Sequence, residues 1–370
     1  MIRFGALVAA LLIAGCNGAA VDPTPVAAHP DGVASSHRPS VHGQIYVLML
    51  PANYQTWISV YSAASASPIR TIPTAVDGSS FFNQSMLFDR RDNLYYADWV
   101  HQTVQVFAPG GSAPAYTIGW GLNSPVALAF DAARNLYVLN NGVFQTGYGA
   151  PSVTVYAPGR RVPSRTIRRG LFNPQAFAFD SAGNLYVANC PMCQGYYSGA
   201  AAAGNIAVYP PGAVKPSRII TDGIAGPNSI AFDGSDNLYV ANQGAYSFNY
   251  CNLGAGSSVT VYAPGGASPT RTITNGIDGP CVLLVDAAGT LYVANAKGTE
   301  GVSVYAPGQS APELTITNGI AGRPIGLAFD RTGNLYVLST ELSVYAPGSG
   351  TPSRTITSGM NQPGAFAVAP

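Results

Sequence analysis

The chain has 370 residues, of which 47% are hydrophobic and only 9% are charged, so it can bury a large core. Its formal net charge is +1. We therefore expect neither a nucleic-acid partner nor a polybasic membrane-binding surface, because both need an excess of positive charge. With 42 Gly and 29 Pro the chain is rich in turns, which favours many short strands.

The N-terminus has the pattern of an export signal. A short basic start precedes an apolar run over residues 4–14, which is too short to span a bilayer as a helix. The next residues, LIAGC, resemble the bacterial lipobox, and this resemblance implies lipidation of Cys16. An ordinary signal peptide cut nearby is the alternative. Asn17 in the following position implies an outer-membrane lipoprotein of the cell envelope, facing the periplasm or the cell surface.

Residues 17–43 are rich in Ala, Pro, Ser and His and show no core-forming pattern. We expect a flexible tether there. The organisation that we predict is thus a signal peptide over residues 1–16, the tether, and one folded domain over residues 44–370.

The folded part is built from a repeat of four short segments. A segment of the LYV type occurs seven times, followed each time by one of the VYAPG type, one of the PSRTI type and one of the AFD type. The LYV tyrosines are Tyr46, Tyr95, Tyr137, Tyr186, Tyr239, Tyr292 and Tyr336. A period of about 40 to 50 residues with four strands per unit is typical of a β-propeller.

Each segment has the chemistry of a particular strand. AFD and LYV are apolar and β-prone, as inner strands A and B must be, and the Asp-x-x-Gly-Asn link between them suits a tight hairpin. Ala-Pro-Gly ends strand C, and the alternating Arg-Thr-Ile predicts a solvated outer strand D.

The two ends of the chain complete one blade between them. The first LYV segment has no AFD strand before it, and the chain ends on an AFD-like segment, Gly364 to Val368, with no LYV after it. We predict an all-β fold, a seven-bladed β-propeller of four-stranded antiparallel blades, closed by the C-terminal strand joining the N-terminal blade. Numbered by their LYV segment, blades 2 to 7 and then blade 1 are expected at 84–118, 126–167, 175–220, 228–273, 281–316, 325–356, and 44–72 with 364–369.

The unit GPNSIAFDGSDNLYVANQ…VTVYAPG closely resembles the NHL repeat, and the resemblance covers nearly everything from residue 44 onward. It implies a six- or seven-bladed propeller and leaves function open, since that superfamily includes lactonases, lyases and interaction modules.

One face of the predicted ring varies far more than the other. The A–B and C–D turns keep nearly the same length in every blade, whereas the B–C loops are long in three consecutive blades, at 140–152, 189–205 and 242–257. Functional residues of repeat proteins tend to lie in such insertions. Large aromatic side chains stand there among Asn, Gln, Ser and Gly, a composition suited to binding a protein, a peptide or a glycan. The candidate ligand-binding residues are Tyr148, Tyr196, Tyr197, Tyr246, Phe248 and Tyr250; the alternative is that they pack the loops against each other.

Four cysteines fall on the same face: Cys190, Cys193, Cys251 and Cys281. Export places them in an oxidising compartment, so we expect two disulfides and favour the pairs Cys190–Cys193 and Cys251–Cys281 among three possible pairings. A Cys₄ zinc site and redox activity of CPMC remain alternatives. Gln194 stands where attachment of a c-type haem requires His.

Catalytic residues are sparse in the repeat. The propeller contains one histidine, His101, and no Ser-His-Asp constellation can readily be assembled. Virginiamycin B lyase-like propellers use histidine and glutamate, which have no match here. Gluconolactonase-like propellers bind a divalent metal through Glu, Asn and Asp, and residues of this kind end the B strands at Asp98, Asn140, Asn189, Asn242 and Asn295. Their repetition favours structural caps over a metal ring.

From these patterns we expect a monomeric, lipid-anchored extracytoplasmic propeller that acts as a binding or scaffold module rather than an enzyme. We expect no cofactor and assign no metal site, although Ca²⁺ or another divalent cation remains open. The alternative is a metal-dependent hydrolase or lactonase of the gluconolactonase-like type at the channel mouth. The membrane is expected to be contacted through the lipid anchor only.

Overall fold

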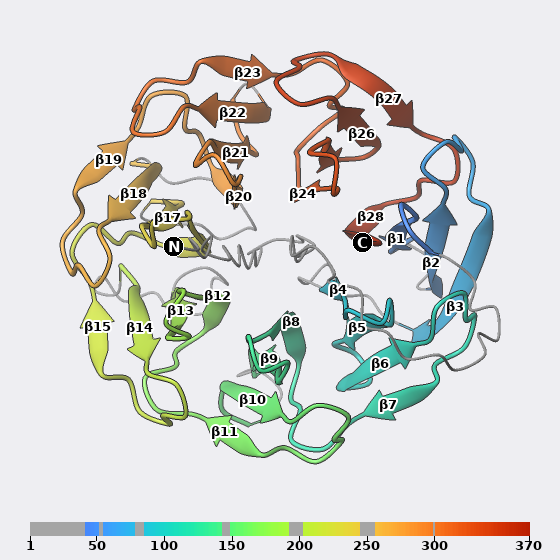
Figure 1. The fold of residues 1–370 in the computed structure, drawn as a ribbon, viewed down its shortest axis with the longest axis horizontal. Coiled ribbons are helices and arrows are strands. Elements are labelled where there is room, and N and C mark those ends of the chain that lie inside the picture. Colours follow the sequence, from blue (N-terminus) through green and yellow to red (C-terminus); the bar gives the residue numbers. More distant parts are fainter. Residues whose placement is uncertain are drawn as a thin grey trace, which may run out of the picture.

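The computed structural model describes residues 41–51, 55–77, 85–142, 149–191, 203–244, 256–298 and 300–370. Its strands form seven four-stranded antiparallel sheets arranged as a ring (Figure 1). The seven-bladed fold predicted from the repeat is therefore confirmed. Among the described residues there is no helix long and apolar enough to cross a membrane.

The strands are given blade by blade, from the inner strand A to the outer strand D. Blade 1 contains β28 (Pro363–Val368), β1 (Ile45–Met49), β2 (Gln55–Tyr61) and β3 (Arg70–Asp77). Blade 2 contains β4 (Met86–Phe88), β5 (Leu94–Asp98), β6 (Thr103–Phe107) and β7 (Tyr116–Ile118). Blade 3 contains β8 (Pro125–Phe130), β9 (Leu136–Asn140), β10 (Ser152–Tyr156) and β11 (Arg165–Ile167).

Blade 4 contains β12 (Pro174–Phe179), β13 (Leu185–Asn189), β14 (Asn205–Tyr209) and β15 (Arg218–Ile220). Blade 5 contains β16 (Pro227–Phe232), β17 (Leu238–Asn242), β18 (Ser258–Tyr262) and β19 (Arg271–Ile273). Blade 6 contains β20 (Pro280–Val285), β21 (Leu291–Asn295), β22 (Gly301–Tyr305) and β23 (Leu314–Ile316). Blade 7 contains β24 (Gly326–Phe329), β25 (Leu335–Leu338), β26 (Leu342–Tyr345) and β27 (Pro352–Ile356).

The ring closes within blade 1, as the sequence predicts. The C-terminal strand β28 pairs with β1 in antiparallel register from Ile45↔Val368 to Met49↔Pro363. Backbone hydrogen bonds extend the pairing beyond the strands, from Ala369 N to Gln44 O and from Gly43 N to Ala369 O. The observed boundary differs most at β3, which continues to Asp77 rather than ending near residue 72.

Neighbouring blades pack through a repeated aromatic contact. The strand-B tyrosine of one blade meets the strand-A phenylalanine of the next edge-on, with ring centroids 4.8–5.2 Å apart. The pairs are Tyr46–Phe88, Tyr95–Phe130, Tyr137–Phe179, Tyr186–Phe232 and Tyr292–Phe329. The two remaining tyrosines, Tyr239 and Tyr336, share buried clusters with Val285 and Val368 instead.

Each A–B hairpin depends on the aspartate that follows strand A. In blade 7, Asp330 Oδ1 accepts hydrogen bonds from the backbone N–H groups of Thr332 and Asn334, and its Oδ2 accepts one from Asn334 Nδ2. The same pattern recurs at Asp89 and Asp233. These aspartates are therefore structural turn residues, as the spacing predicts.

The outer strand D lies at the edge of each blade, as predicted, and its central residue is exposed in blades 2, 4, 5 and 6, but its arginine turns away from solvent in two blades. Arg70 of β3 donates hydrogen bonds to Tyr46 Oη in its own blade and to the Gly110 and Gly111 carbonyls of blade 2. Arg218 of β15 likewise reaches Tyr186 Oη and the Gly265 carbonyl of the next blade. The repeated arginine therefore links adjacent blades, because its long side chain turns inward over the tyrosine.

The closing strand gives a direct test of ring stability. Phe366 of β28 is fully buried, so Phe366→Ala should lower the free energy of unfolding by about 3–5 kcal/mol, measured by chemical denaturation. Ile69→Ala, in the same blade but at an exposed position, is the control and should cost less than about 1 kcal/mol. Equal losses in the two variants would contradict a closure that depends on β28.

The hairpin aspartates make stability depend on pH. Burial opposes ionisation of Asp330, but the hydrogen bonds from Asn334 and Thr332 together outweigh it and lower the pKa of this carboxyl below its usual 3.8. A depressed pKa adds stability above the unfolded-state value, and that stability is lost as pH falls below it. Asp330→Asn should therefore cost about 1–2 kcal/mol at pH 7 and progressively less below about pH 4. Asp222→Asn, at an exposed side chain, is the control; a pH-independent loss in Asp330→Asn would contradict this account.

Candidate functional site

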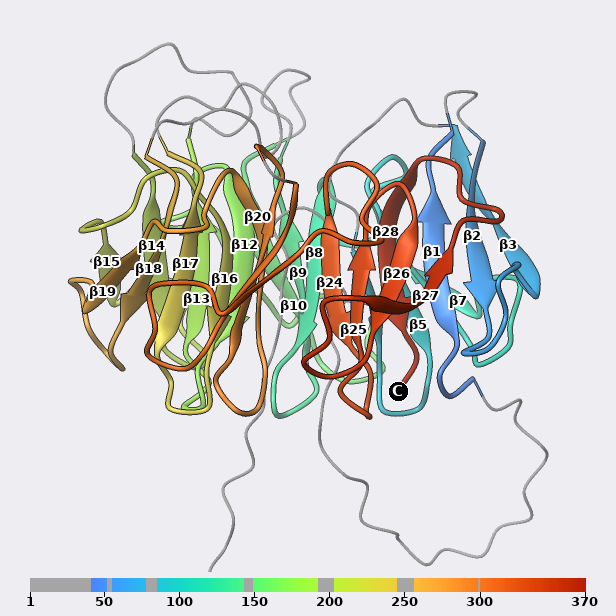
Figure 2. The same cartoon turned by 90° about the horizontal axis from the view of Figure 1, so that it is seen from above.

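The three long B–C loops arise from the same rim of the ring. Strands β9, β13 and β17 run in the same sense through consecutive blades, so their C-terminal ends face one rim, which we call the B–C rim (Figures 1 and 2). The A–B hairpins lie at the opposite rim, and so does residue 41, the first described residue, because β1 is a B strand. The tether predicted for residues 17–43 therefore joins the ring on the side away from the long loops.

The aromatic residues proposed to contact a ligand lie outside the described residues. These are Tyr148, Tyr196, Tyr197, Tyr246, Phe248 and Tyr250. The same holds for Cys16, Cys193 and Cys251. What the structure gives for this face is the base of each loop, the residues that hold it, and the neighbouring blade on which it rests.

The asparagines that end the B strands tie their blade to the preceding crossover. The Oδ1 atoms of Asn140, Asn189, Asn242 and Asn295 each accept a backbone N–H of that crossover, at 2.9–3.0 Å. In blades 4 to 6 the Nδ2 atom donates to a glycine carbonyl of the same crossover, at 2.9–3.2 Å. Both ends of each amide are thus used, which confirms the prediction of structural caps.

The strand-C tyrosines add a second tie, which sequence reasoning did not identify. Each hydroxyl donates to a carbonyl of the crossover entering its blade: Tyr156 to Trp120, Tyr209 to Arg169, Tyr262 to Asp222, Tyr305 to Asn275, Tyr345 to Asn318 and Tyr61 to Ser358, at 2.5–3.0 Å. Burial raises the pKa of Tyr305 to about 12, so its hydroxyl stays protonated and can donate at neutral pH. The recurrence of Tyr in VYAPG, where a β-strand needs only an apolar residue, was the available signal.

The bases of two long loops also reach across to the next blade. Ala203, at the end of the blade 4 loop, accepts a hydrogen bond from Gly226 N in the crossover to blade 5. Ser257, at the end of the blade 5 loop, contacts Gly279 N in the crossover to blade 6 through its hydroxyl, at 3.3 Å. The feet of these loops are therefore fixed to one another through the crossovers and not only to their own strands.

The two described cysteines of the B–C rim are deeply buried. Cys190 follows β13 directly, and its carbonyl accepts a hydrogen bond from Asn173 Nδ2 at 2.7 Å. Cys281 lies in β20, and its carbonyl accepts one from Asn228 Nδ2 at 3.3 Å. Cys190 stands at the base of the blade 4 loop, whereas Cys281 stands near the start of the inner strand β20. The pairing Cys190–Cys193 and Cys251–Cys281 stays a prediction, because Cys193 and Cys251 are outside the described residues.

Blade 2 departs from the asparagine tie and contains the histidine of the ring. Asp98 replaces the asparagine and is fully buried, while the His101 side chain is 45% exposed. The Asp98 carboxylate contacts His101 Nδ1 at 2.9 Å and accepts hydrogen bonds from His101 N and Gln105 Nε2. With these partners Asp98 caps the short B–C turn and orients the imidazole.

The part of the chain that the structure describes contains no cluster of candidate metal ligands. Nowhere in those residues do three or more His, Cys, Asp or Glu side chains gather closely enough to hold a metal ion.

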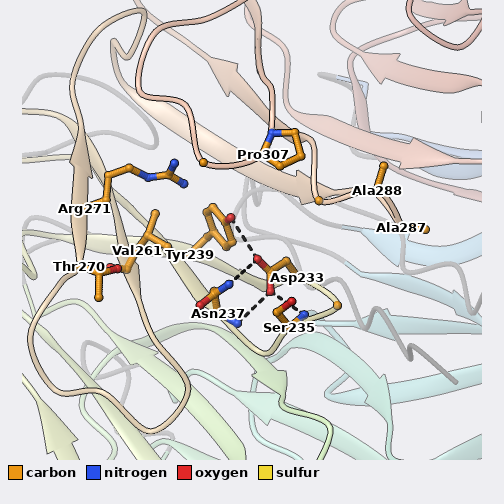
Figure 3. A pocket seen from close by; sticks show the side chains of 13 residues that line it. Asp233, Ser235, Asn237, Tyr239, Val261, Thr270, Arg271, Ala287, Ala288 and Pro307 are labelled. Carbon is orange, nitrogen blue, oxygen red and sulfur yellow. Dashed lines mark hydrogen bonds between the residues drawn. The ribbon is translucent and has the colours of Figure 1, made fainter. Parts of the chain in front are cut away.

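A cleft of about 630 Å³ opens at the A–B rim between blades 5 and 6 (Figure 3). Asp233, Tyr239 and Arg271 line it on one side, and Gly289 and Pro307 on the other. Asp233 Oδ2 lies 3.3 Å from the Tyr239 hydroxyl and also accepts a hydrogen bond from Asn237. The carboxylate is therefore already engaged within its own blade.

Small residues explain this opening. At the preceding junction Ser181 donates hydrogen bonds to Asp236 of the next blade. The equivalent positions at the cleft are Gly234 and Gly289, which have no side chain to bridge the gap, and Val285 replaces the phenylalanine that Tyr186 meets one junction earlier. The cleft is thus a local variation in blade packing, on the rim opposite the long loops.

Comparisons with known proteins identify the architecture. No family model matches the sequence, and a search of curated proteins gives no match. Among solved structures the chain is similar to Kuenenia stuttgartiensis hydrazine synthase, with a TM-score of 0.54 and 15% sequence identity over 70% of this chain and 75% of that chain. At this identity the likeness shows the propeller fold alone.

The asparagine tie predicts a clear loss when its amide is removed. Asn242→Ala should lower the free energy of unfolding by about 1–3 kcal/mol, because the partly buried Ala225 N–H and the Gly223 carbonyl lose their partner. Ser257→Ala, which alters only the loop base, should cost less than about 1 kcal/mol by the same denaturation measurement. If Asn242→Ala left the stability unchanged, the asparagines would again be candidate metal ligands.

Proposed function

We propose that this chain is a lipid-anchored β-propeller of the bacterial cell envelope that acts as a binding or scaffold module. Its ligand is a protein, a peptide or a glycan, contacted by the loops at 140–152, 189–205 and 242–257. The molecule acts as a monomer at the outer membrane, attached through Cys16, and its repeat is of the NHL type.

The observation that carries this proposal is the placement of the three long loops. They rise from consecutive blades on one rim, and the feet of two are bonded to the following crossover by Ala203 and Ser257. The chain enters the ring at the opposite rim, so a tether from a membrane would leave the B–C rim on the side away from it. A rigid ring that presents adjacent loops is the arrangement repeat proteins use for recognition.

We further propose that the four cysteines form two disulfides, Cys190–Cys193 and Cys251–Cys281, which order the two loops containing Cys193 and Cys251. Cys190 and Cys281 are buried beside backbone that is already held by Asn173 and Asn228. A covalent link from such fixed points limits the conformations of a glycine-rich loop.

The metal-dependent hydrolase is a weaker candidate, because the side-chain atoms that could bind a metal already have hydrogen-bond partners. The oxygen and the amide nitrogen of the recurring asparagines at the B-strand ends already form hydrogen bonds with backbone groups. The Asp98 carboxylate is likewise engaged by His101 and Gln105. Metal binding at these positions would first have to break the ties that hold the crossovers.

Replacing the blade 4 loop tests the binding function. Residues 190–204 are exchanged for the short link of blade 6, residues 296–300, and the purified chain is assayed for capture of envelope proteins and of immobilised glycans. We expect an unchanged circular dichroism spectrum and at least a tenfold loss of capture. The control exchanges Ala287 and Ala288 on the opposite rim for serine and should keep full capture.

Capture that survives the loop exchange would contradict the proposed site. A rise in melting temperature of the unaltered chain with Ca²⁺, Mn²⁺ or Zn²⁺, absent in Asn242→Ala, would instead favour the hydrolase.

A further inference from the structure

Positive charge is concentrated in one blade of this nearly neutral chain. Between Asp131 and Asp180 there is no acidic residue, and this stretch contains Arg134, Arg160, Arg161, Arg165, Arg168 and Arg169. Arg160 and Arg161 follow the C–D turn of blade 3, and Arg168 and Arg169 follow its outer strand β11. These four arginines are exposed, and so is Lys215 in the next blade. We call these five residues the basic band.

The fold does not require this charge. Each repeat supplies an internal comparison, and the positions of Arg168 and Arg169 are occupied by Thr274–Asn275 in blade 5 and Thr317–Asn318 in blade 6. Those of Arg160 and Arg161 are occupied by Gln309–Ser310 in blade 6. Blades of the same architecture therefore form with uncharged residues at all four places.

Contacts between blades place the ends of the basic band beside residues of the neighbouring blades. Gly121, in the crossover from blade 2, packs against Pro163, so Trp120 lies beside the turn that bears Arg161. Gly170, in the next crossover, packs against Pro216 in the same way, which brings Arg169 beside Lys215. The band thus follows the outer edge of blades 3 and 4.

Exposed apolar side chains accompany the charge. Trp120 is 73% exposed and Val162 is 65% exposed, and they belong to the two segments that meet at Gly121 and Pro163. The Arg161 guanidinium lies 4.7 Å from the centroid of the Tyr116 ring, which holds that charge at the surface beside them. Arginine with exposed tryptophan and valine matches a bilayer interface, where phosphates meet the guanidinium groups and the boundary of the acyl chains accepts the apolar side chains.

We propose that the basic band, with Trp120 and Val162, docks directly onto the surface of an anionic phospholipid bilayer. The complementary partner is a layer of phosphates with an apolar layer beneath, since charge alone would leave Trp120 and Val162 without a partner. This contact departs from two expectations drawn from the sequence: that the low net charge argues against a polybasic membrane-binding surface, and that the membrane is contacted through the lipid anchor only. It is independent of lipidation, because every residue in it belongs to the ring.

The test uses the chain from Asn17 onward, which keeps all the described strands and lacks both Cys16 and the apolar leader. Its partition onto vesicles of phosphatidylglycerol and phosphatidylcholine is compared with that onto phosphatidylcholine alone, by sedimentation at several salt concentrations. We expect binding to the anionic vesicles that weakens as salt rises. Tryptophan emission should shift to the blue on binding, and this shift should be lost in Trp120→Asn.

Removing two charges measures the band itself. Arg168→Thr with Arg169→Asn copies blade 5 and should weaken binding about thirtyfold, at ~1 kcal/mol per arginine. The matched control, Arg91→Gln with Arg331→Gln, removes two exposed charges from A–B turns elsewhere and should change binding less than threefold. Circular dichroism checks that both variants are folded.

Two outcomes would overturn the proposal. One is equal vesicle binding by the Arg168/Arg169 variant and its control. The other is binding to soluble heparin or polyphosphate with no binding to phosphatidylglycerol vesicles, which would assign the band to a soluble polyanion instead.

Discussion

The ring depends on the contact that each blade makes with the next. A four-stranded blade buries its two faces only if a neighbour covers each of them, so the structure is stable as a closed circle. The edge-on packing of a strand-B tyrosine against the next strand-A phenylalanine provides this cover at five junctions. The arginine of strand D donates a hydrogen bond to the hydroxyl of the same tyrosine in blades 1 and 4 and another to the C–D turn of the next blade. Where Val285 replaces the phenylalanine, the packing loosens and the cleft beside Tyr239 opens.

The crossovers are held just as regularly, and this frees the B–C loops from a structural role. The crossover entering every blade except blade 2, whose strand C has Phe107, accepts a hydrogen bond from a strand-C tyrosine hydroxyl. In blades 3 to 6 the crossover also donates a backbone N–H to an asparagine at the end of strand B. These hydrogen bonds hold the blade without using residues from the middle of the B–C loop. The loop can therefore lengthen without disturbing the strands, which is what the sequence shows at blades 3, 4 and 5.

Much of the fold could be predicted from the sequence, because every blade of a propeller repeats the same four strand segments. The seven LYV segments set the number of blades, and the unmatched strand at Gly364–Val368 set the closure. The side-chain ties were harder to predict, since a tyrosine that recurs in VYAPG is equally consistent with simple burial. Strand D is the outer strand of each blade, as predicted, but alternation alone does not show that Arg70 and Arg218 turn inward. The long loops were located by their length, but their aromatic residues follow no repeat, so neither pattern nor period predicts their arrangement.

A repeat also separates what the fold needs from what it merely carries. Thr–Asn and Gln–Ser pairs serve in other blades where blade 3 has two pairs of arginines, so those charges are additions to a scaffold that is complete without them. The same reasoning applies to the loop that contains Cys190, whose blade 6 counterpart is a short turn. The net charge of +1 does not reveal the four added arginines of blade 3, because acidic residues elsewhere in the chain offset them in the total. At a Debye length of about 8 Å, charges across the ring do not neutralise one another, and a partner responds to the local band rather than to the total.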